Sequence, residues 1–139
     1  MPNTDFNNSG TECTWFGITC NAAGTQVTSI DLPNNGLNGT VPASLSAVSA
    51  LTYLDLSGNA LSGAISALSG LTSLQTVYFN SNQFTGAVPA LSGLTSLQLF
   101  EAFSNQLNAP LPPLTGLTAL QRFNVSGNQI PGALPALTG

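Results

Sequence analysis

The sequence predicts an α/β solenoid: a right-handed superhelix of stacked coils with a parallel sheet on the concave side. The first observation is a phrase of the form LxxLxLxxNxL, which occurs five times with its asparagines 23 or 24 residues apart. The second is that apolar and polar residues alternate within each phrase at the strand period of two. The segments between the phrases contain Gly and Ser, which favours turns and short 3₁₀ pieces on the convex side and little α-helix.

The alternating apolar positions supply the predicted core. In the second repeat these positions hold Leu51, Leu54 and Leu56, with Leu61 after the asparagine. No single repeat can bury this face alone, because it needs the next coil to cover it. Stacking about 4.8 Å apart would join the short strands into one parallel sheet.

Five asparagines end these strands, and the core alternation stops at each of them. They are Asn35, Asn59, Asn82, Asn105 and Asn128. Buried carbonyls at a turn need donors, and an asparagine amide supplies two N–H groups. We therefore predict a structural role for these asparagines, with their amides bonded to carbonyls of neighbouring coils.

The stretch after each asparagine has its own pattern, L-x-G-x-I-P, seen at residues 37–42, 61–66 and 84–89. Glycine permits a tight turn there, and proline ends a short extended piece. The pattern resembles the plant-type extracellular leucine-rich repeat of receptor-kinase ectodomains and polygalacturonase inhibitors, which also occurs in protozoan surface antigens. The resemblance covers residues 27–139, with departures at Ala109 in the glycine column and Ser66 in the proline column.

The segment Cys13-Thr14-Trp15-Phe16-Gly17-Ile18-Thr19-Cys20 is similar to the C-x-W-x-G-V-x-C signature of the cap that precedes such repeats. This resemblance implies a disulfide between Cys13 and Cys20, with Trp15 covering the first coil. Two cysteines without any histidine are also too few ligands for a zinc site, so we expect no metal. A disulfide indicates an oxidising compartment. The expected organisation is a truncated cap at 1–26 and five repeats at 27–139 without a C-terminal cap.

The composition of the chain argues against nucleic acid as a partner and against insertion into a membrane. The formal net charge is −4 and the sequence pI is about 4.1, so nucleic acid would be repelled. Ser, Thr and Gly interrupt every apolar stretch, so no membrane-spanning segment is expected. The first residues do not form a signal peptide, which suggests a mature form or a fragment. The resemblance and the cysteines together imply an extracellular or cell-surface location.

The repeats vary most at the positions that face solvent on the inner sheet. The convex connectors are uniform, since residues 67–75 and 90–98 are identical, which is typical of a shared structural task. The inner-face positions, in contrast, collect charged and aromatic residues, which are frequent at interface hot spots. We predict a ligand-binding surface there, formed by Tyr53, Asp55, Tyr78, Glu101, Phe103 and Arg122.

These observations predict a non-enzymatic recognition module for a protein, peptide or glycan. The chain has no histidine and no lysine, and the one carboxylate pair, Asp31 and Asp55, would lie on an open wall without a pocket. We therefore expect neither a catalytic site nor a cofactor. Two alternatives stay open: a structural or antigenic surface repeat whose polar inner face only keeps it soluble, and ice or polysaccharide binding through Thr72, Thr95 and Thr118.

The last repeat adds one further expectation. Leu120, Phe123 and Val125 have no polar cap after them in the sequence. An uncovered coil exposes apolar side chains and strand groups. We expect either a fragment of a longer array or a homodimer through this edge.

Overall fold

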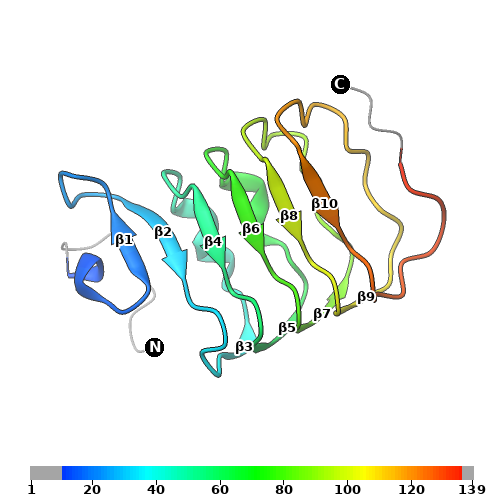
Figure 1. Ribbon diagram of the computed structural model, residues 1–139, viewed down its shortest axis with the longest axis horizontal. Helices are drawn as coiled ribbons and strands as arrows, with labels where there is room; N and C mark the ends of the chain where they lie inside the picture. The colour runs from blue at the N-terminus through cyan, green and yellow to red at the C-terminus, as the bar shows by residue number, and fades with distance from the viewer. Residues whose placement is uncertain (1–10, 136–139) are drawn as a thin grey trace.

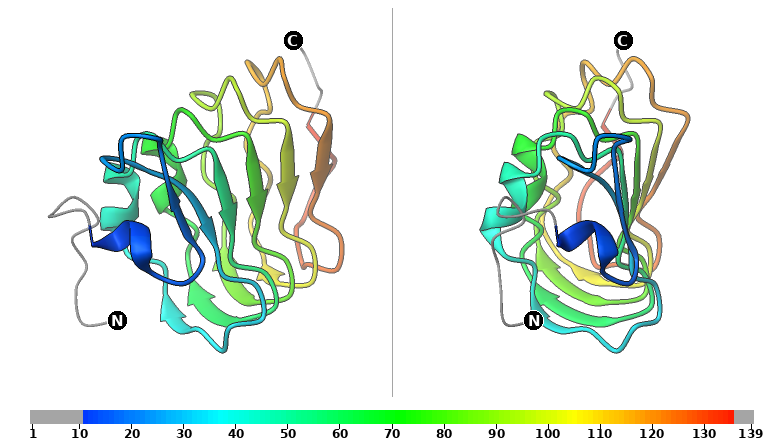
Figure 2. Two further views of the ribbon diagram at one scale, coloured as in Figure 1. Left: turned by 60° about the vertical axis from the view of Figure 1, so that its left-hand side comes forward. Right: turned by 90° about the vertical axis from the view of Figure 1, so that its left-hand side faces the viewer.

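The computed structural model describes residues 11–135, so the first ten residues of the expected cap and residues 136–139 lie outside the described part. It shows a solenoid of about four turns with parallel strands and almost no helix (Figure 1). The helices of the described part are three short 3₁₀ segments: η1 (Glu12–Thr14), η2 (Ala43–Ala47) and η3 (Ala67–Gly70). Figure 2 shows η2 and η3 on the side of the coil opposite the larger sheet. The predicted fold class is confirmed.

The larger sheet has six strands in the order β1-β2-β4-β6-β8-β10. Their bounds are β1 Ile18–Cys20, β2 Val27–Asp31, β4 Tyr53–Asp55, β6 Thr76–Tyr78, β8 Leu99–Glu101 and β10 Arg122–Asn124. Each phrase supplies one strand, and the strands from β2 onward pair in parallel, whereas β1 pairs antiparallel with β2. The register aligns equivalent positions of successive repeats, as in the column of Asp31, Asp55, Tyr78, Glu101 and Asn124.

A second parallel sheet lies beyond the asparagines, and the sequence analysis did not predict it. Its strands are β3 (Asn38–Thr40), β5 (Ala60–Gly63), β7 (Gln83–Gly86) and β9 (Gln106–Leu107), in the order β3-β5-β7-β9. They come from the L-x-G-x-I-P stretches, whose glycines take positive φ at Gly39, Gly63 and Gly86. The repeat with Ala109 in the glycine column has the shortest strand of this sheet.

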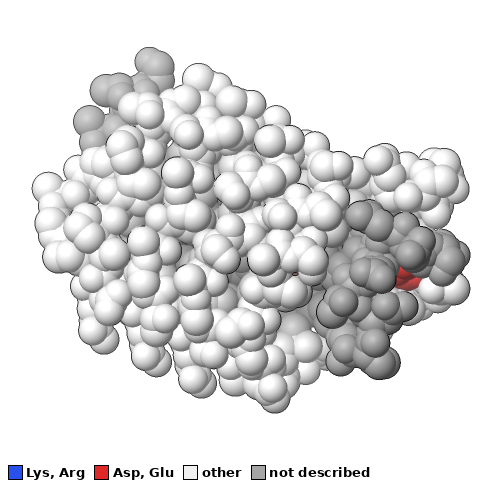
Figure 3. Space-filling model, turned by 180° about the vertical axis from the view of Figure 1, so that it is seen from behind, with Lys and Arg blue, Asp and Glu red and all other residues white. Residues whose placement is uncertain are grey.

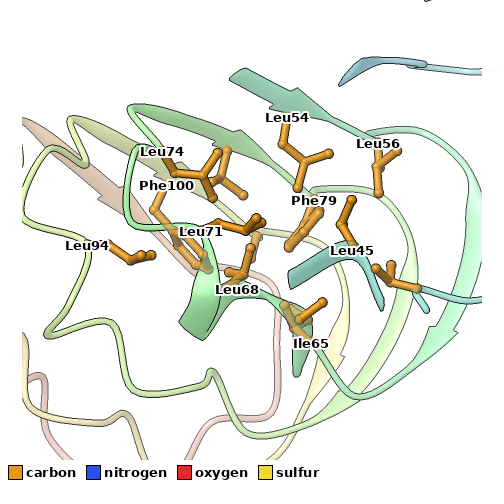
Figure 4. Packing of buried hydrophobic residues seen from close by; sticks show 14 of the residues in the cluster. Leu45, Leu54, Leu56, Ile65, Leu68, Leu71, Leu74, Phe79, Leu94 and Phe100 are labelled. Atoms are coloured by element: carbon orange, nitrogen blue, oxygen red, sulfur yellow. The ribbon is translucent and has the colours of Figure 1, made fainter. Parts of the chain in front are cut away.

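The core fills the space between the sheets and the convex turns (Figure 4). Leu54, Leu68 and Phe100 have no exposed surface, and the rings of Phe79 and Phe84 lie 5.2 Å apart between centroids. Burying a side chain of this size contributes about 1.5 to 3 kcal/mol. Burial falls off toward the last coil, where Leu120, Phe123, Val125 and Ile130 are only partly buried.

Four of the repeat asparagines bond neighbouring coils to one another. The Nδ2 group of Asn82 donates to the carbonyl of Leu56 in the preceding coil at 2.9 Å and to that of Phe79 in its own coil at 3.1 Å. Its Oδ1 accepts the backbone N–H of Leu61 at 3.0 Å. Asn59, Asn105 and Asn128 repeat this pattern.

Asn35 differs from the other four asparagines. Its side chain is exposed and makes no hydrogen bond with the described residues, whereas its backbone N–H donates to Oδ1 of Asn59 at 2.9 Å. The preceding strand is β1, which runs antiparallel to β2, so no equivalent coil offers carbonyls to this side chain. The structural role predicted for Asn35 is therefore not seen.

The cap joins the first repeat through a disulfide between Cys13 and Cys20 and a close backbone approach. The backbone N–H of Asp31 donates to the carbonyl of Gly17 at 2.7 Å. Gly17 has φ of +75°, and a Cβ there would overlap the Asp31 carbonyl and the Leu32 side chain. This packing explains the glycine of the cap signature, since no larger residue fits.

Candidate functional site on the concave face

The concave face is formed by the outward-pointing side chains of β2, β4, β6, β8 and β10. Because side chains alternate along a strand, Leu54, Val77 and Phe100 point into the core while their neighbours point to this face. Adjacent strands are about 4.8 Å apart, so equivalent residues of neighbouring repeats are within side-chain contact distance. The outward side chains of these strands therefore form a regular grid, the concave grid, whose rows and columns follow from the register of the sheet.

The first cluster on this face joins β4 and β6. The rings of Tyr53 and Tyr78 lie edge to face, with centroids 6.1 Å apart and planes at 61°. Asp55 is held by the backbone N–H of Ser57, which donates to Oδ1 at 2.8 Å, while the Tyr53 hydroxyl lies 3.5 Å from Oδ2. Asp31 is the register partner of Asp55 on β2. Two tyrosines and two carboxylates thus occupy one patch.

The electrostatics of this patch are visible at Tyr53. Partial burial of its hydroxyl, together with the negative charges of Asp55 and Asp31, raises the pKa of Tyr53 from 10.0 to about 12. Proximity to Tyr78 and the hydrogen bond to Asp55 act in the same direction. Both carboxylates therefore place negative potential at this phenol.

The second cluster joins β8 and β10. Arg122 Nε pairs with Oε1 of Glu101 at 2.5 Å, although the arginine side chain is 64% exposed. Glu101 itself is only 3% exposed, and its Oε2 is buried without a hydrogen-bond partner among the described residues. The sequence analysis placed Glu101 among solvent-facing positions, and that exposure was wrong. The carboxylate of this pair is buried, whereas the guanidinium on the neighbouring strand is open to solvent.

The structure brings Tyr53, Asp55, Tyr78, Glu101 and Arg122 onto neighbouring strands of one sheet, in two adjacent clusters. Tyr78 lies between Asp55 and Glu101 in register, so the clusters adjoin. Phe103, which follows β8, is half-buried. The prediction omitted Asp31, whose charge acts on Tyr53; its position in the Asp55 column was the signal that could have included it.

The described part of the opposite face carries almost no charge (Figure 3). Figure 3 views it from behind, and its described surface shows no basic residue and one acidic spot beside the grey residues. The described residues contain no group of three or more His, Cys, Asp or Glu side chains able to hold a metal ion. No helix in residues 11–135 is long and apolar enough to cross a membrane.

An apolar cavity of about 800 Å³ lies between the cap and the first coils, away from the concave clusters. Trp15, Ile18, Ile30, Leu37 and Leu45 line it. Phe16 at its edge is 81% exposed. This space was not predicted from the sequence, which led us to expect Trp15 to cover the first coil.

The repeat geometry and the patterned inner face define a class of protein, the repeat solenoid with a variable concave surface. A family model described as leucine rich repeat matches residues 25–84. Among curated proteins, the chain is 47% identical over 58 residues to the rice (Oryza sativa subsp. japonica) receptor protein kinase WSS1. That match covers 41% of this chain and 6% of the kinase, so the chain corresponds to a small part of that relative's length.

The matches to solved structures cover a larger part of this chain. The BIR2 ectodomain from Arabidopsis thaliana superposes with a TM-score of 0.84 and 30% identity, over 96% of this chain and 72% of that one. The Arabidopsis receptor kinase HAESA ectodomain, solved with a peptide hormone ligand, gives a TM-score of 0.74 and 26% identity, over 88% of this chain and 21% of that one. The chain belongs to the leucine-rich-repeat family, in the plant type found in receptor-kinase ectodomains.

Proposed function

We propose that this chain is a non-enzymatic extracellular recognition module that holds a protein or peptide on its concave face. One observation carries the proposal. All four charged side chains of residues 27–135 lie on the concave grid, together with both tyrosines: Asp31, Tyr53, Asp55, Tyr78, Glu101 and Arg122. The convex connectors, in contrast, repeat an identical nonapeptide. Aromatic and arginine side chains supply much of the binding energy at protein interfaces.

The relatives support a recognition role. The HAESA ectodomain was solved with a peptide hormone ligand, and other similar ectodomains were solved with protein partners. The relatives are receptor kinases by name, but the segments that match this chain are their repeat regions, so kinase activity is not carried over. The same relatives and the Cys13–Cys20 disulfide support placement outside the cell or at its surface.

The test is a peptide and glycan array probed with the whole chain and two double variants. Tyr53→Ala/Tyr78→Ala removes the rings of the concave face, whereas Thr72→Ala/Thr95→Ala makes a smaller truncation at two exposed convex positions. We expect binders of the wild type to be lost with the tyrosine variant and kept with the threonine variant. The reverse pattern would place recognition on the convex face. Circular dichroism of each variant checks that folding is unchanged.

Glycans stay in the array because the sequence does not separate them from peptides as ligands. The second class of function, ice or polysaccharide binding through Thr72, Thr95 and Thr118, predicts thermal hysteresis or polysaccharide retention that the threonine variant abolishes. A purely structural or antigenic repeat predicts no specific binder on any array. Each class therefore has its own outcome in the same set of measurements.

The proposed organisation is a cap at 1–26 and repeats at 27–139, with self-association through the last coil as a further prediction. Phe123 and Val125 are only partly covered, and Leu134 is 77% exposed. The outer edge of β10 has no strand partner among the described residues. A two-fold dimer through this edge would appear in sedimentation equilibrium and dissociate on Val125→Lys. A monomer at high micromolar concentration would reject it.

A further inference from the structure

We infer that the concave face takes a positively charged side chain of its partner, a lysine or arginine of a peptide segment, over Tyr53 and Tyr78 and against Asp31 and Asp55. The inference rests on the proposed function, because it names the chemistry of the ligand for that same face. It adds that the partner is basic, which neither the fold nor the resemblance requires. The contacts and the charge balance each support it.

The carboxylates of this patch offer oxygens to a donor from outside. Asp31 and Asp55 are register partners on neighbouring parallel strands, about 4.8 Å apart at the backbone. The Ser57 N–H fixes Oδ1 of Asp55 at 2.8 Å, and Oδ2 has only the long 3.5 Å contact with the Tyr53 hydroxyl. Asp31 is exposed. A guanidinium or ammonium group can bridge two such carboxylates with charge-assisted hydrogen bonds.

The two tyrosines add a surface suited to a cation. Their rings lie edge to face at 6.1 Å and both are half-buried, so part of each ring stays open on the concave side. A cation within about 6 Å of an aromatic centroid is attracted to the ring's negative face. An arginine or lysine reaching Asp55 would lie beside both rings. Carboxylates and aromatic rings therefore favour the same class of ligand.

Among residues 11–135, no cationic side chain pairs with Asp31 or Asp55. Arg122 is the chain's only Lys or Arg residue, and it pairs with Glu101 on the far side of Tyr78. The three concave carboxylates and this one guanidinium leave the face with a formal charge of −2. The two aspartates therefore stay exposed to an incoming cation.

A divalent metal ion fits this patch less well than a basic side chain does. Calcium takes about six to eight oxygen ligands, whereas the patch offers two carboxylates, and the described residues hold no cluster of three ligating side chains. The tyrosine rings would also contribute nothing to the binding of a metal ion. Calcium is therefore included in the experiment as the competing ligand.

The experiment is an NMR titration of the ¹⁵N-labelled full chain with a hexa-arginine peptide at low salt, with hexaglutamine and hexaglutamate as references and calcium chloride as a separate probe. We expect hexa-arginine to shift the amides of Asp31, Tyr53, Asp55 and Tyr78, and added sodium chloride to weaken the effect. Hexaglutamate should leave these amides unmoved.

Two variants with the same net charge separate a site from general attraction. Asp31→Asn/Asp55→Asn raises the net charge by two on the concave face, and Thr72→Lys/Thr95→Lys raises it by two on the exposed convex connectors. The first should weaken hexa-arginine binding by about tenfold, the second by about twofold. Tyr53→Leu should weaken binding while Tyr53→Phe preserves it, because the ring rather than the hydroxyl contacts the cation. Thermal unfolding confirms that each variant is folded.

The outcomes that overturn the inference are distinct from those that overturn the proposed function. Equal weakening by the two double variants, or calcium moving the same amides more strongly than hexa-arginine, rejects the cation site. Concave shifts with hexaglutamine or hexaglutamate but not with hexa-arginine also reject it, yet leave concave recognition intact. Hexa-arginine shifts confined to the convex turns or the cap reject the inference, whereas the proposed function is decided by the array with the tyrosine and threonine variants. A hexa-arginine titration that moves no concave amide rejects the inference.

Discussion

Arg122 and Glu101 form an ion pair in which one partner is open to water and the other is not. The Nε to Oε1 distance is 2.5 Å, while the arginine side chain is 64% exposed and that of the glutamate only 4%. Glu101 is thus a nearly buried negative charge, and its cationic partner is the exposed side chain of Arg122. Removing the arginine would leave the glutamate charge uncompensated, which costs more than losing an exposed pair.

Arg122→Met keeps much of the aliphatic stem and removes the guanidinium. We expect it to lower the free energy of unfolding by about 1 to 3 kcal/mol, because Glu101 then lacks its charged donor. Adding Glu101→Gln to Arg122→Met should restore most of the loss, since a neutral amide is easier to bury. Urea unfolding of the two single variants and the double variant gives the coupling directly. If Arg122→Met lowers the free energy of unfolding by less than about 0.5 kcal/mol, water already donates hydrogen bonds to the Glu101 carboxylate.

The asparagines offer a matched pair of substitutions. Asn82→Ala removes an amide that is 8% exposed and bonded to Leu56, Phe79 and Leu61, so buried carbonyls and an N–H lose their partners. We expect a loss of about 1 to 3 kcal/mol in the free energy of unfolding. Asn35→Ala should change it by less than about 0.5 kcal/mol, because that side chain is exposed. Similar losses at both positions would show that the asparagine column acts through the turn conformation instead.

The sequence predicted the coil stacking because two independent periods agreed. Leu54 and Leu56 follow the strand period of two, and Leu54, Val77 and Phe100 recur with the repeat period, so the core positions of the strands were identified from a single chain. The concave location of Tyr53 and Tyr78 followed from the same alternation. These features depend on local order along the chain.

The features that were missed depend on neighbours across coils. Glu101 has a surface position in its own repeat, and its burial comes from the residues that the register sets around it, Tyr78 and Arg122 among them. The side chain of Asn35 likewise makes no hydrogen bond to a neighbouring coil, because β1 pairs antiparallel with β2. The second sheet needed the L-x-G-x-I-P stretches to be read as strands, although glycine and proline are poor strand residues.

Core substitutions should lower the free energy of unfolding less in the last coil than in a central coil, because burial decreases toward the last coil. Phe79→Ala in a central coil removes a ring that is 1% exposed and packed on Phe84, and should cost about 3 to 5 kcal/mol. Phe123→Ala makes the same change in the last coil, where the ring is only partly buried and stacks on Phe100 at one side. We expect a clearly smaller loss there, because one neighbouring coil covers it instead of two. Equal losses by urea unfolding would indicate that the last coil is covered in solution, as a dimer through β10 would do.

Alkaline pH should destabilise the chain through Tyr53. Its pKa is raised to about 12 in the folded state, against 10.0 for an ordinary phenol. The folded state therefore keeps its proton where the unfolded state loses it, so the contribution of Tyr53 to stability is fully present below pH 10 and is lost as pH rises toward 12. Phenolate absorbance at 295 nm should show one late-titrating tyrosine that disappears in Tyr53→Phe. Asp55→Asn should lower the pKa of Tyr53, because it removes the nearer carboxylate charge and weakens the hydrogen bond. An unchanged late titration in Asp55→Asn would assign the raised pKa of Tyr53 to burial and to the other neighbours, Asp31 and Tyr78, and leave Asp55 without electrostatic influence on this phenol.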